Sequence, residues 1–293
     1  MLPILAFVAI IVAVFITGTV LSYPLYLFIS SVSDAGLHKS VHYSILLTGL
    51  CACIIYLHKT QALAALFGSA NTRKQNLKLI SAGFAAGLVI LLIIESSLIG
   101  LGLRQPDPDL GEGLVKFIVA VIKAVVTGFI VSFMEESLYR GGIFTGLARY
   151  TNFITALLIT SIFYGAVHFI DFPEPVSGSV ISWSTSFGIL SQGFMQFSDP
   201  LILDSVFSLA LLGLLFGMMR WRTGNLMLCT GAHAGIVTAN KIFSYSTDYK
   251  SGSPYEFLVN SYDHQTGLLA STCLIIACLI YYYRWMKNKK QSA

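Results

Sequence analysis

Nine ionisable side chains fall inside or at the edges of apolar runs, where a charge is costly and usually marks either function or a buried structural pair. They are Glu95, Lys123, Glu135, Glu136, Arg140, His168, Asp204, His233 and Lys241. Glu95 and Lys123, on neighbouring predicted spans, are interpreted as a structural ion pair or as span ends that reach the interface. Asp204 and Lys241 lie near span ends and are also interpreted as structural. The remaining five are the candidates for chemistry.

Two adjacent carboxylates and an arginine occur in the segment Phe133-Met-Glu-Glu-Ser-Leu-Tyr-Arg-Gly-Gly142. Glu136 and Arg140 are four residues apart and share one helical face, whereas Glu135 points about 100° away from Glu136. Arg140 is therefore expected to neutralise Glu136 and to leave Glu135 available. The two glycines that follow allow another helix or a substrate backbone to approach closely.

A histidine is expected beside Glu135 on the next helix. From a turn centred near Thr151, Glu135 lies 16 residues back and His168 lies 17 residues forward. Two antiparallel helices of equal rise then bring both side chains to nearly the same depth. Tyr164, one turn before His168, shares its face and is expected to offer its hydroxyl to the site.

A second histidine, His233, lies in Thr230-Gly-Ala-His-Ala-Gly235, where small residues again permit close helix packing. A lone histidine in a membrane helix is usually a packing residue. Two histidines that converge with an unpaired glutamate favour function instead, because such a cluster is expensive to bury.

A glutamate and a histidine around one water form a general-base pair that can drive hydroxide attack on a carbonyl group. Glu135 and His168 are the predicted pair, and His233 is predicted to donate a hydrogen bond to the developing oxyanion. Glu, His and His are also good zinc ligands, so a zinc site is an alternative. It is the weaker one because none of the three stands in a zinc motif, and we expect neither a metal nor another cofactor. The sequence has no HExxH, GxSxG or P-loop signature.

The composition shows what must position these residues. Of 293 residues, 55% are hydrophobic and 11% are charged, with a mean hydropathy of +0.75, which excludes a soluble globule. The first apolar run lacks the basic start and cleavage site of a signal peptide, so it is interpreted as a retained span. The sequence predicts an all-α, polytopic membrane helical bundle, a single integral domain over 1–293 with its motif-bearing core at about 114–242. About eight transmembrane helices are expected, at 2–30, 42–57, 79–103, 114–148, 152–170, 201–219, 225–242 and 266–283.

Basic residues in the loops predict the orientation. Alternate loops and the tail hold twelve basic residues, against three in the other set, which carries ten acidic residues. Both termini are therefore predicted to be cytoplasmic, in an integral protein of the plasma membrane. The segment 171–200, on the opposite side, is interpreted as an aromatic belt or as an interfacial or re-entrant hairpin.

The partners follow from the same composition. The net charge of +4 comes without a stretch of basic and aromatic residues, so nucleic acid is not expected as a partner. The lipid bilayer and a peptide or protein substrate in or at the membrane are expected instead. The five cysteines lie in apolar runs and are interpreted as small core residues.

Residues 114–242 resemble the CPBP intramembrane endopeptidases, the CAAX protease and bacteriocin-processing family, also called Abi or type II CAAX prenyl proteases. The family motif EExxxR is complete from Glu135 to Arg140, and FxxxH appears as Tyr164-Gly-Ala-Val-His168 with Tyr in place of Phe. In the third motif, a His followed four residues later by Asn or Asp, the chain has His233 but Val237.

The resemblance implies a glutamate-dependent, metal-independent peptide hydrolase whose site opens towards the cytoplasmic side. Glu135 and His168 would activate water, His233 would stabilise the oxyanion, and Glu136 with Arg140 would shape the site.

Val237 cannot donate a hydrogen bond, so the family position of the second oxyanion donor has no donor in this chain. Asn240, about one turn further along the same face, is the candidate to replace it. The rival hypothesis, which Val237 favours, is a non-catalytic membrane protein that binds or carries a peptide, such as an immunity or transport-like factor.

Overall fold

The computed structural model describes residues 2–31, 36–107, 113–176 and 180–286. Within these ranges the α-helices are α1 (Leu2–Ser30), α2 (Leu37–Lys59), α3 (Leu63–Leu66), α4 (Arg73–Gly100), α5 (Leu114–Glu136), α6 (Thr145–Tyr150), α7 (Phe153–Val167), α8 (Trp183–Gly193), α9 (Leu203–Thr223), α10 (Met227–Ser246) and α11 (Leu268–Tyr281). Two π-helical segments, Ser137–Phe144 and Tyr282–Met286, continue α5 and α11. Short 3₁₀ turns lie at Met195–Ser198, Pro200–Ile202 and Glu256–Leu258.

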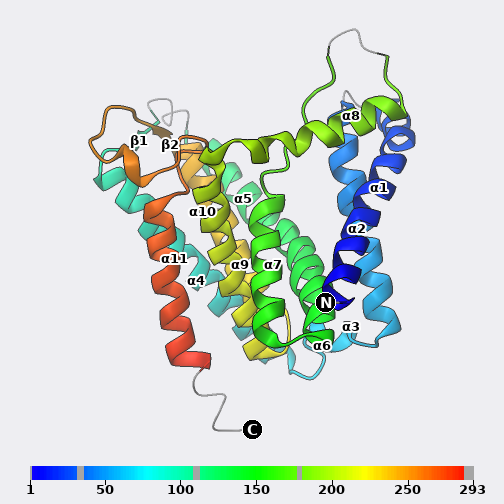
Figure 1. Ribbon diagram of the computed structural model, residues 1–293. Coiled ribbons are helices and arrows are strands. Elements are labelled where there is room, and N and C mark those ends of the chain that lie inside the picture. The colour runs from blue at the N-terminus through cyan, green and yellow to red at the C-terminus, as the bar shows by residue number, and fades with distance from the viewer. Residues whose placement is uncertain (1, 32–35, 108–112, 177–179, 287–293) are drawn as a thin grey trace.

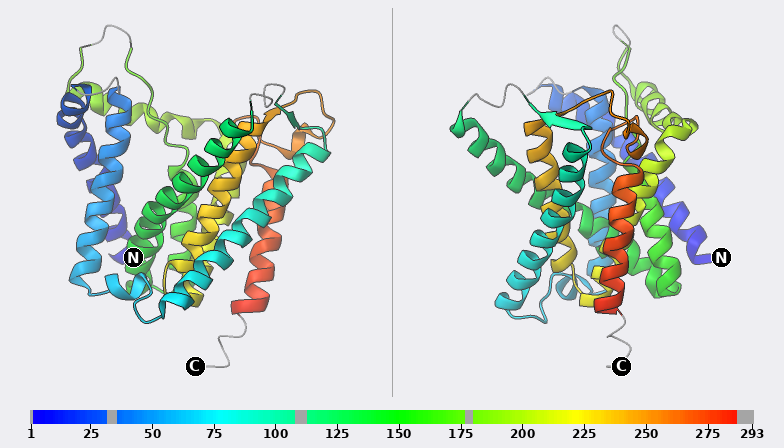
Figure 2. Two further views of the ribbon diagram at one scale, coloured as in Figure 1. Left: turned by 180° about the vertical axis from the view of Figure 1, so that it is seen from behind. Right: turned by 90° about the vertical axis from the view of Figure 1, so that its left-hand side faces the viewer.

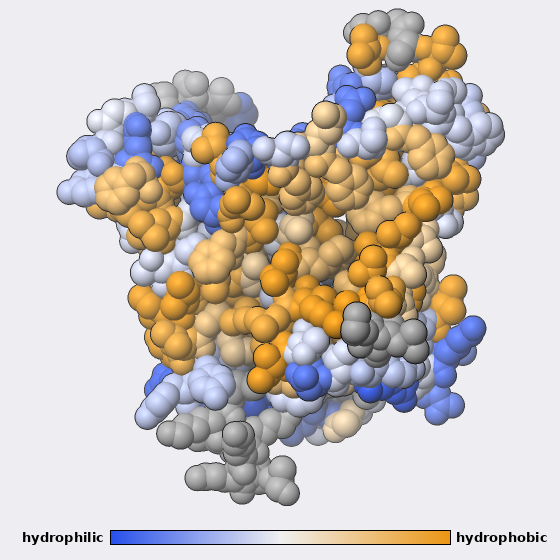
Figure 3. Space-filling model, in the orientation of Figure 1, coloured by the Kyte–Doolittle hydropathy of each residue, from blue (hydrophilic) through white to orange (hydrophobic). Residues whose placement is uncertain are grey.

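The described helices form a membrane bundle, as predicted. Five are long and apolar enough to cross a bilayer: Ile4–Ser30, Leu37–Lys59, Arg73–Gly100, Leu114–Tyr150 and Pro200–Thr223. Two shorter apolar helices follow, Phe153–Val167 and Leu268–Arg284. The space-filling view has an apolar band between two hydrophilic ends (Figure 3). The chain is thus an all-α, polytopic integral membrane protein. α10 occupies the seventh predicted run, 225–242, although the count of eight spans stays a prediction.

The helices divide into a hairpin and a larger bundle. The hairpin of α1 and α2 stands to one side, while α4, α5 and α10 run tilted beside one another (Figures 1 and 2). α7 and α11 lie in front of α4 and α5 in Figure 1. α10 packs mainly on α4 and α5. α1 begins, and α11 ends, toward the end of the bundle that carries α3 and α6 (Figure 1).

Paired glycines bring α10 into backbone contact with α4. A Cβ atom on Gly87 would lie 2.0 Å from the carbonyl oxygen of Ala232, and one on Gly235 would lie 2.2 Å from a carbonyl oxygen of α4. One turn away, Gly83 and Gly231 make the reciprocal approach. Such small-residue seams let membrane helices gain packing contacts without side chains between them. The helix that carries His233 is therefore held rigidly against α4.

The predicted span 114–148 is not one regular helix. After α5, residues Ser137–Phe144 adopt π-helical geometry before α6 resumes the α-helix. The wider turn changes which carbonyl groups are free: the thiol of Cys53 donates to the Ser137 carbonyl at 3.1 Å, and the Thr145 hydroxyl donates to the Arg140 carbonyl at 3.0 Å. Helical periodicity in the sequence cannot reveal such an inserted residue, because it shifts the face by only part of a turn.

Two segments at the α8 end differ from a simple set of spans. Strands β1 (Arg104–Pro106) and β2 (Thr247–Tyr249) form an antiparallel ribbon that the sequence did not predict. α8 lies across this end of the bundle (Figure 1), where the indole of Trp183 donates to the Val20 carbonyl at 2.9 Å. The segment 171–200, over its described residues, thus contains an interfacial helix.

The expected pairing of Glu95 with Lys123 is wrong. Glu95 is fully buried and lies 3.5 Å from Arg104, which the ribbon folds back over the end of α4, and it also accepts a hydrogen bond from Gln265. Lys123 is exposed on α5. Asp204 is structural as expected, since it binds the side chain of Asn260.

Candidate active site

Three helices bring Glu135, His168 and His233 together. Glu135 is next to last in α5, His168 caps the C-terminus of α7, and His233 lies in the first half of α10. Oε2 of Glu135 lies 3.6 Å from Nε2 of His168 and 4.0 Å from Nε2 of His233. The hairpin geometry and the convergence expected from the sequence are both present in the structure.

The neighbouring carboxylate is bound through one of its two oxygens. Oε1 of Glu136 lies 3.0 Å from Nη1 of Arg140 and 3.0 Å from Nδ1 of His233, whereas its buried Oε2 accepts no hydrogen bond from the described residues. Arg140 also donates to the carbonyl of Gly213 on α9 at 3.2 Å. Glu136, Arg140 and His233 are buried, so Glu136 links α5, α9 and α10 through a buried ion pair.

Glu135 is the less constrained of the two. Its side chain is 21% exposed, whereas that of Glu136 is 0% exposed. Its Oε2 atom is nevertheless buried and accepts no hydrogen bond from the part of the chain that the structure describes. A carboxylate oxygen in that state is free to bind a proton donor from outside the protein.

Tyr164 contacts two residues of the site. Its carbonyl oxygen lies 2.7 Å from Nδ1 of His168, and its ring centroid lies 4.3 Å from the guanidinium of Arg140. The ring also meets that of His168 edge to face at 4.5 Å. Tyr164 thus orients His168 through its backbone and supports Arg140 through a cation–π contact, while the role expected for its hydroxyl group stays a prediction.

Backbone and carboxylate partners determine the histidine tautomers. A carbonyl oxygen only accepts, so Nδ1 of His168 carries the hydrogen, and the neutral ring presents the lone pair of Nε2 to Glu135. The same reasoning places a hydrogen on Nδ1 of His233, which faces the Glu136 carboxylate. Two acceptors, Nε2 of His168 and Oε2 of Glu135, therefore face each other at a spacing too long for a direct hydrogen bond and suited to a shared donor.

Asn240 lies in a different polar cluster. Its Oδ1 atom accepts a hydrogen bond from Gln265 at 2.9 Å, beside Glu95. Seven residues separate it from His233, which is about 10.5 Å along the helix. This placement argues against Asn240 as the missing oxyanion donor, and its role there stays a prediction.

One histidine near the site was missed. His42, in the first turns of α2, interacts electrostatically with Glu135 and Asp171, and its ring contacts Phe172 at 6.2 Å. In the sequence it stands at the first residue of the run 42–57, where a polar side chain is taken for a span end. No spacing rule connects it to the motifs, because α2 reaches the site only through the tertiary fold.

Metal binding was tested on the same geometry. Across the described ranges, no three His, Cys, Asp or Glu side chains converge in an arrangement suited to a metal ion.

Comparison with known proteins gives one result. Residues 117–239 match the family model described as type II CAAX prenyl endopeptidase Rce1-like. This segment belongs to the Rce1-like family. It includes most of α5, the π segment, α6 to α9 and most of α10, and so carries Glu135, His168 and His233. No curated protein and no solved structure matches the chain.

The Rce1-like match confirms the resemblance drawn from the motifs and supports, at the coarse level, a peptidase. The helices α1, α2, α4 and α11 lie outside the matched segment.

Proposed function

We propose that the chain is an intramembrane endopeptidase in which Glu135 and His168 activate water and His233 stabilises the oxyanion. The observation that carries the proposal is the convergence of two imidazole nitrogens on Oε2 of Glu135, at 3.6 and 4.0 Å. The Rce1-like match supports peptide hydrolysis of the CAAX-protease type as the reaction class. The residue roles rest on the geometry.

In the proposed reaction, a water molecule donates one hydrogen bond to Glu135 and the other to Nε2 of His168. Glu135 takes a proton as the water oxygen bonds to the scissile carbonyl carbon, which gives a tetrahedral oxyanion. When that intermediate collapses, the carbon–nitrogen bond breaks and the departing amine receives the proton from Glu135. The products are a carboxylic acid and an amine, and no other reactant is consumed.

His233 can donate to the oxyanion only in its protonated form. Its Nδ1–H is held by Glu136, so Nε2 carries a hydrogen only when the ring is an imidazolium. In that form the proposed donor lies on Nε2, the nitrogen that faces Glu135 at 4.0 Å.

The test compares membranes that contain the wild-type chain with membranes that contain Glu135→Gln. New peptide termini should appear in the wild type and be missing in the variant, and the purified proteins should show the same difference on the peptide so identified. Glu174→Gln is the matched control, because the Glu174 side chain is 81% exposed and lies on the α8 side of the bundle. Equal cleavage by wild type and Glu135→Gln would contradict the proposal. Peptide binding without cleavage in either would support the rival, non-catalytic hypothesis.

A further inference from the structure

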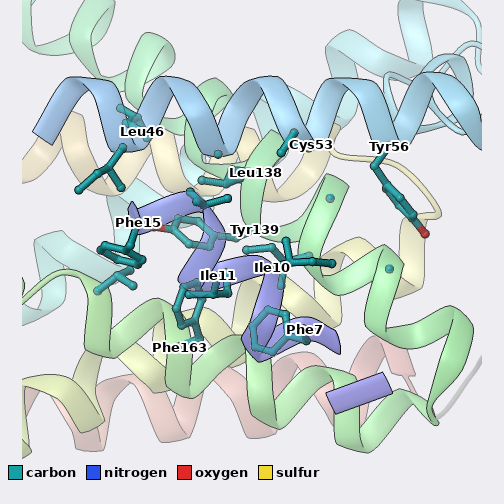
Figure 4. Close-up of a pocket in the computed structure, with 18 of the residues that line it drawn as sticks. Phe7, Ile10, Ile11, Phe15, Leu46, Cys53, Tyr56, Leu138, Tyr139 and Phe163 are labelled. Atoms are coloured by element: carbon teal, nitrogen blue, oxygen red, sulfur yellow. The ribbon is translucent and has the colours of Figure 1, made fainter. Parts of the chain in front are cut away.

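A large apolar groove lies beside the Glu135 cluster without including its three side chains. It has a volume of about 870 Å³ and separates the α1–α2 hairpin from the π segment and α7. Phe7, Ile10 and Ile11 of α1 face Leu46 of α2 and Phe163 of α7 across it (Figure 4). Glu135, His168 and His233 are not among its lining residues. The groove is therefore a second concave site.

The groove extends through much of the membrane depth. His42 and Lys59 both line it, and both lie on α2, 17 residues apart. At 1.5 Å per residue they are about 25 Å apart along the helix, against about 30 Å for the hydrocarbon core of a bilayer. A ligand that fills the groove must therefore be long and lie roughly parallel to the spans.

The lining chemistry favours a hydrocarbon chain over an extended peptide. Between its two ends the groove is formed almost entirely by aliphatic and aromatic side chains. An extended peptide would leave its N–H and C=O groups without partners there, at a cost of several kcal/mol each. A hydrocarbon chain has no such groups.

One end of the groove offers hydrogen-bond donors and a positive charge. Lys59 is exposed at the end of α2, and Tyr150 lies near it at the end of α6. The hydroxyl of Tyr56, which also lines the groove, is buried and has no hydrogen-bond partner among the described residues. This is the end of the bundle that carries the basic loops, where a cationic pocket between helices attracts anionic headgroups.

We propose that the groove binds an anionic phospholipid of the bilayer. One acyl chain lies among the apolar side chains of α1, α2 and α7, and the phosphate accepts hydrogen bonds from the ammonium of Lys59 and the hydroxyl of Tyr56. The positive charge at this end attracts an anionic headgroup more strongly than a zwitterionic one.

The bound chain would also touch the helix that carries the two glutamates. Leu138, Tyr139 and Gly142 of the π segment form one wall of the groove. The ring of Tyr139 meets that of Tyr164 at 5.1 Å, and Tyr164 in turn supports Arg140. A filled groove thus braces the π segment next to the Glu135 cluster. Binding itself does not depend on the proposed hydrolysis.

The headgroup is tested with delipidated full-length protein, to which phosphatidylglycerol or phosphatidylcholine with the same acyl chains is added back. Native mass spectrometry counts the retained lipid. We expect phosphatidylglycerol to be preferred and Lys59→Gln to lower its affinity about fivefold, with phosphatidylcholine unchanged. Lys74→Gln is the matched control, because Lys74 is an exposed cation at the same end that does not line the groove. Equal effects of the two variants would overturn the headgroup assignment.

The acyl chain is tested by a pair of neighbours on α1. Ile11 lines the groove, whereas Val12 is 50% exposed and does not. Ile11→Trp should reduce retention of phosphatidylglycerol, and Val12→Trp should not. A phospholipid with a photoreactive acyl chain provides a readout in the wild type, where labelling should map to lining residues.

Two results would overturn this part of the proposal. One is labelling spread evenly over the lipid-facing surface. The other is retention of a free fatty acid in preference to phosphatidylglycerol, since it would assign the groove to a different anionic amphiphile.

Discussion

Glu135 and Glu136 are adjacent in the sequence and differ sharply in environment. Glu136 is buried and bound by both Arg140 and His233, so it organises three helices. Glu135 keeps one oxygen without a hydrogen bond from the described residues, at the point where two histidines converge. Two carboxylates this close are tolerated only when the charge of one is neutralised, and Arg140 neutralises that of Glu136. The contrast in exposure and in bound partners is consistent with the proposed division, in which Glu135 carries the chemistry and Glu136 positions the helices.

Glu135→Gln should remove turnover and leave the fold intact. The amide keeps the shape of the side chain but cannot accept a proton, and a general base contributes about 10²- to 10⁴-fold in rate. The measurement is peptide hydrolysis by purified protein, with thermal unfolding as the control for structure. Residual activity above about a tenth of wild type would remove Glu135 from the mechanism.

Glu136→Gln should instead reduce stability as well as rate. It leaves Arg140 buried without its counter-ion and releases His233 from its hydrogen bond. Breaking a buried ion pair from one side costs about 3 kcal/mol or more. Chemical denaturation in detergent would measure the loss. An unchanged unfolding midpoint would contradict the positioning role.

Position 237 provides a gain-of-function test. A single oxyanion donor is typically worth about a hundredfold to a thousandfold in rate. Val237→Asn should therefore raise turnover, because it places an amide one turn from His233. Asn240→Ala should change turnover by less than about twofold, because Asn240 is engaged with Gln265. The opposite pattern, a slow Asn240→Ala and an unaffected Val237→Asn, would return the donor role to Asn240.

Chelation addresses the zinc alternative. If Glu135 and His168 activate water by themselves, prolonged treatment with a strong zinc chelator should leave turnover within error of the untreated protein. Elemental analysis of the same sample provides the second readout. Activity lost on chelation and restored by added zinc would establish a metalloenzyme and reject the glutamate mechanism.

At the scale of the elements, the sequence predicted where the helices lie but not how they are deformed. Apolar runs identified the helices because spans of about 20 residues have few alternatives in a bilayer. The convergence of Glu135 and His168 was predictable because one short turn joins their helices. The π segment, the β1–β2 ribbon and the pairing of Glu95 with Arg104 were not, since each depends on contacts between segments far apart in the chain.

The glycine seam between α4 and α10 predicts how the site responds to packing. A methyl group on Gly87 would lie 2.0 Å from the carbonyl oxygen of Ala232, so Gly87→Ala must push α10 away from α4. His233 lies next to Ala232 and would move with it. We expect a loss of about 1 to 3 kcal/mol in stability together with at least tenfold lower turnover.

Gly100→Ala provides the control on the same helix, because a Cβ atom there meets nothing within 4 Å. It should leave stability within about 0.5 kcal/mol and turnover unchanged. Matched effects of the two substitutions would mean that the seam does not position His233.

At the scale of the whole molecule, the distribution of basic residues predicts the orientation of the chain in the membrane. Arg140 and Arg220, counted among the basic loop residues, are largely buried and do not report on topology. The remaining basic residues of that set still outnumber those of the opposite set, and within the described ranges they gather at the end with α3 and α6. Without Arg140 and Arg220, the basic loop residues therefore predict the same orientation.

We propose that the end with α3 and α6 faces the cytoplasm of a cell whose plasma membrane holds the chain, since translocation disfavours lysine and arginine. Ser69→Cys places a thiol in an exposed position between α3 and α4, and Ser251→Cys places one after β2 at the opposite end. A membrane-impermeant maleimide added to intact cells should label the second variant and not the first, and permeabilised cells should show both labelled. The native cysteines lie within helices, and the unmodified chain gives their background. Labelling of Ser69→Cys alone in intact cells would invert the molecule and place the cationic end of the phospholipid groove in the outer leaflet.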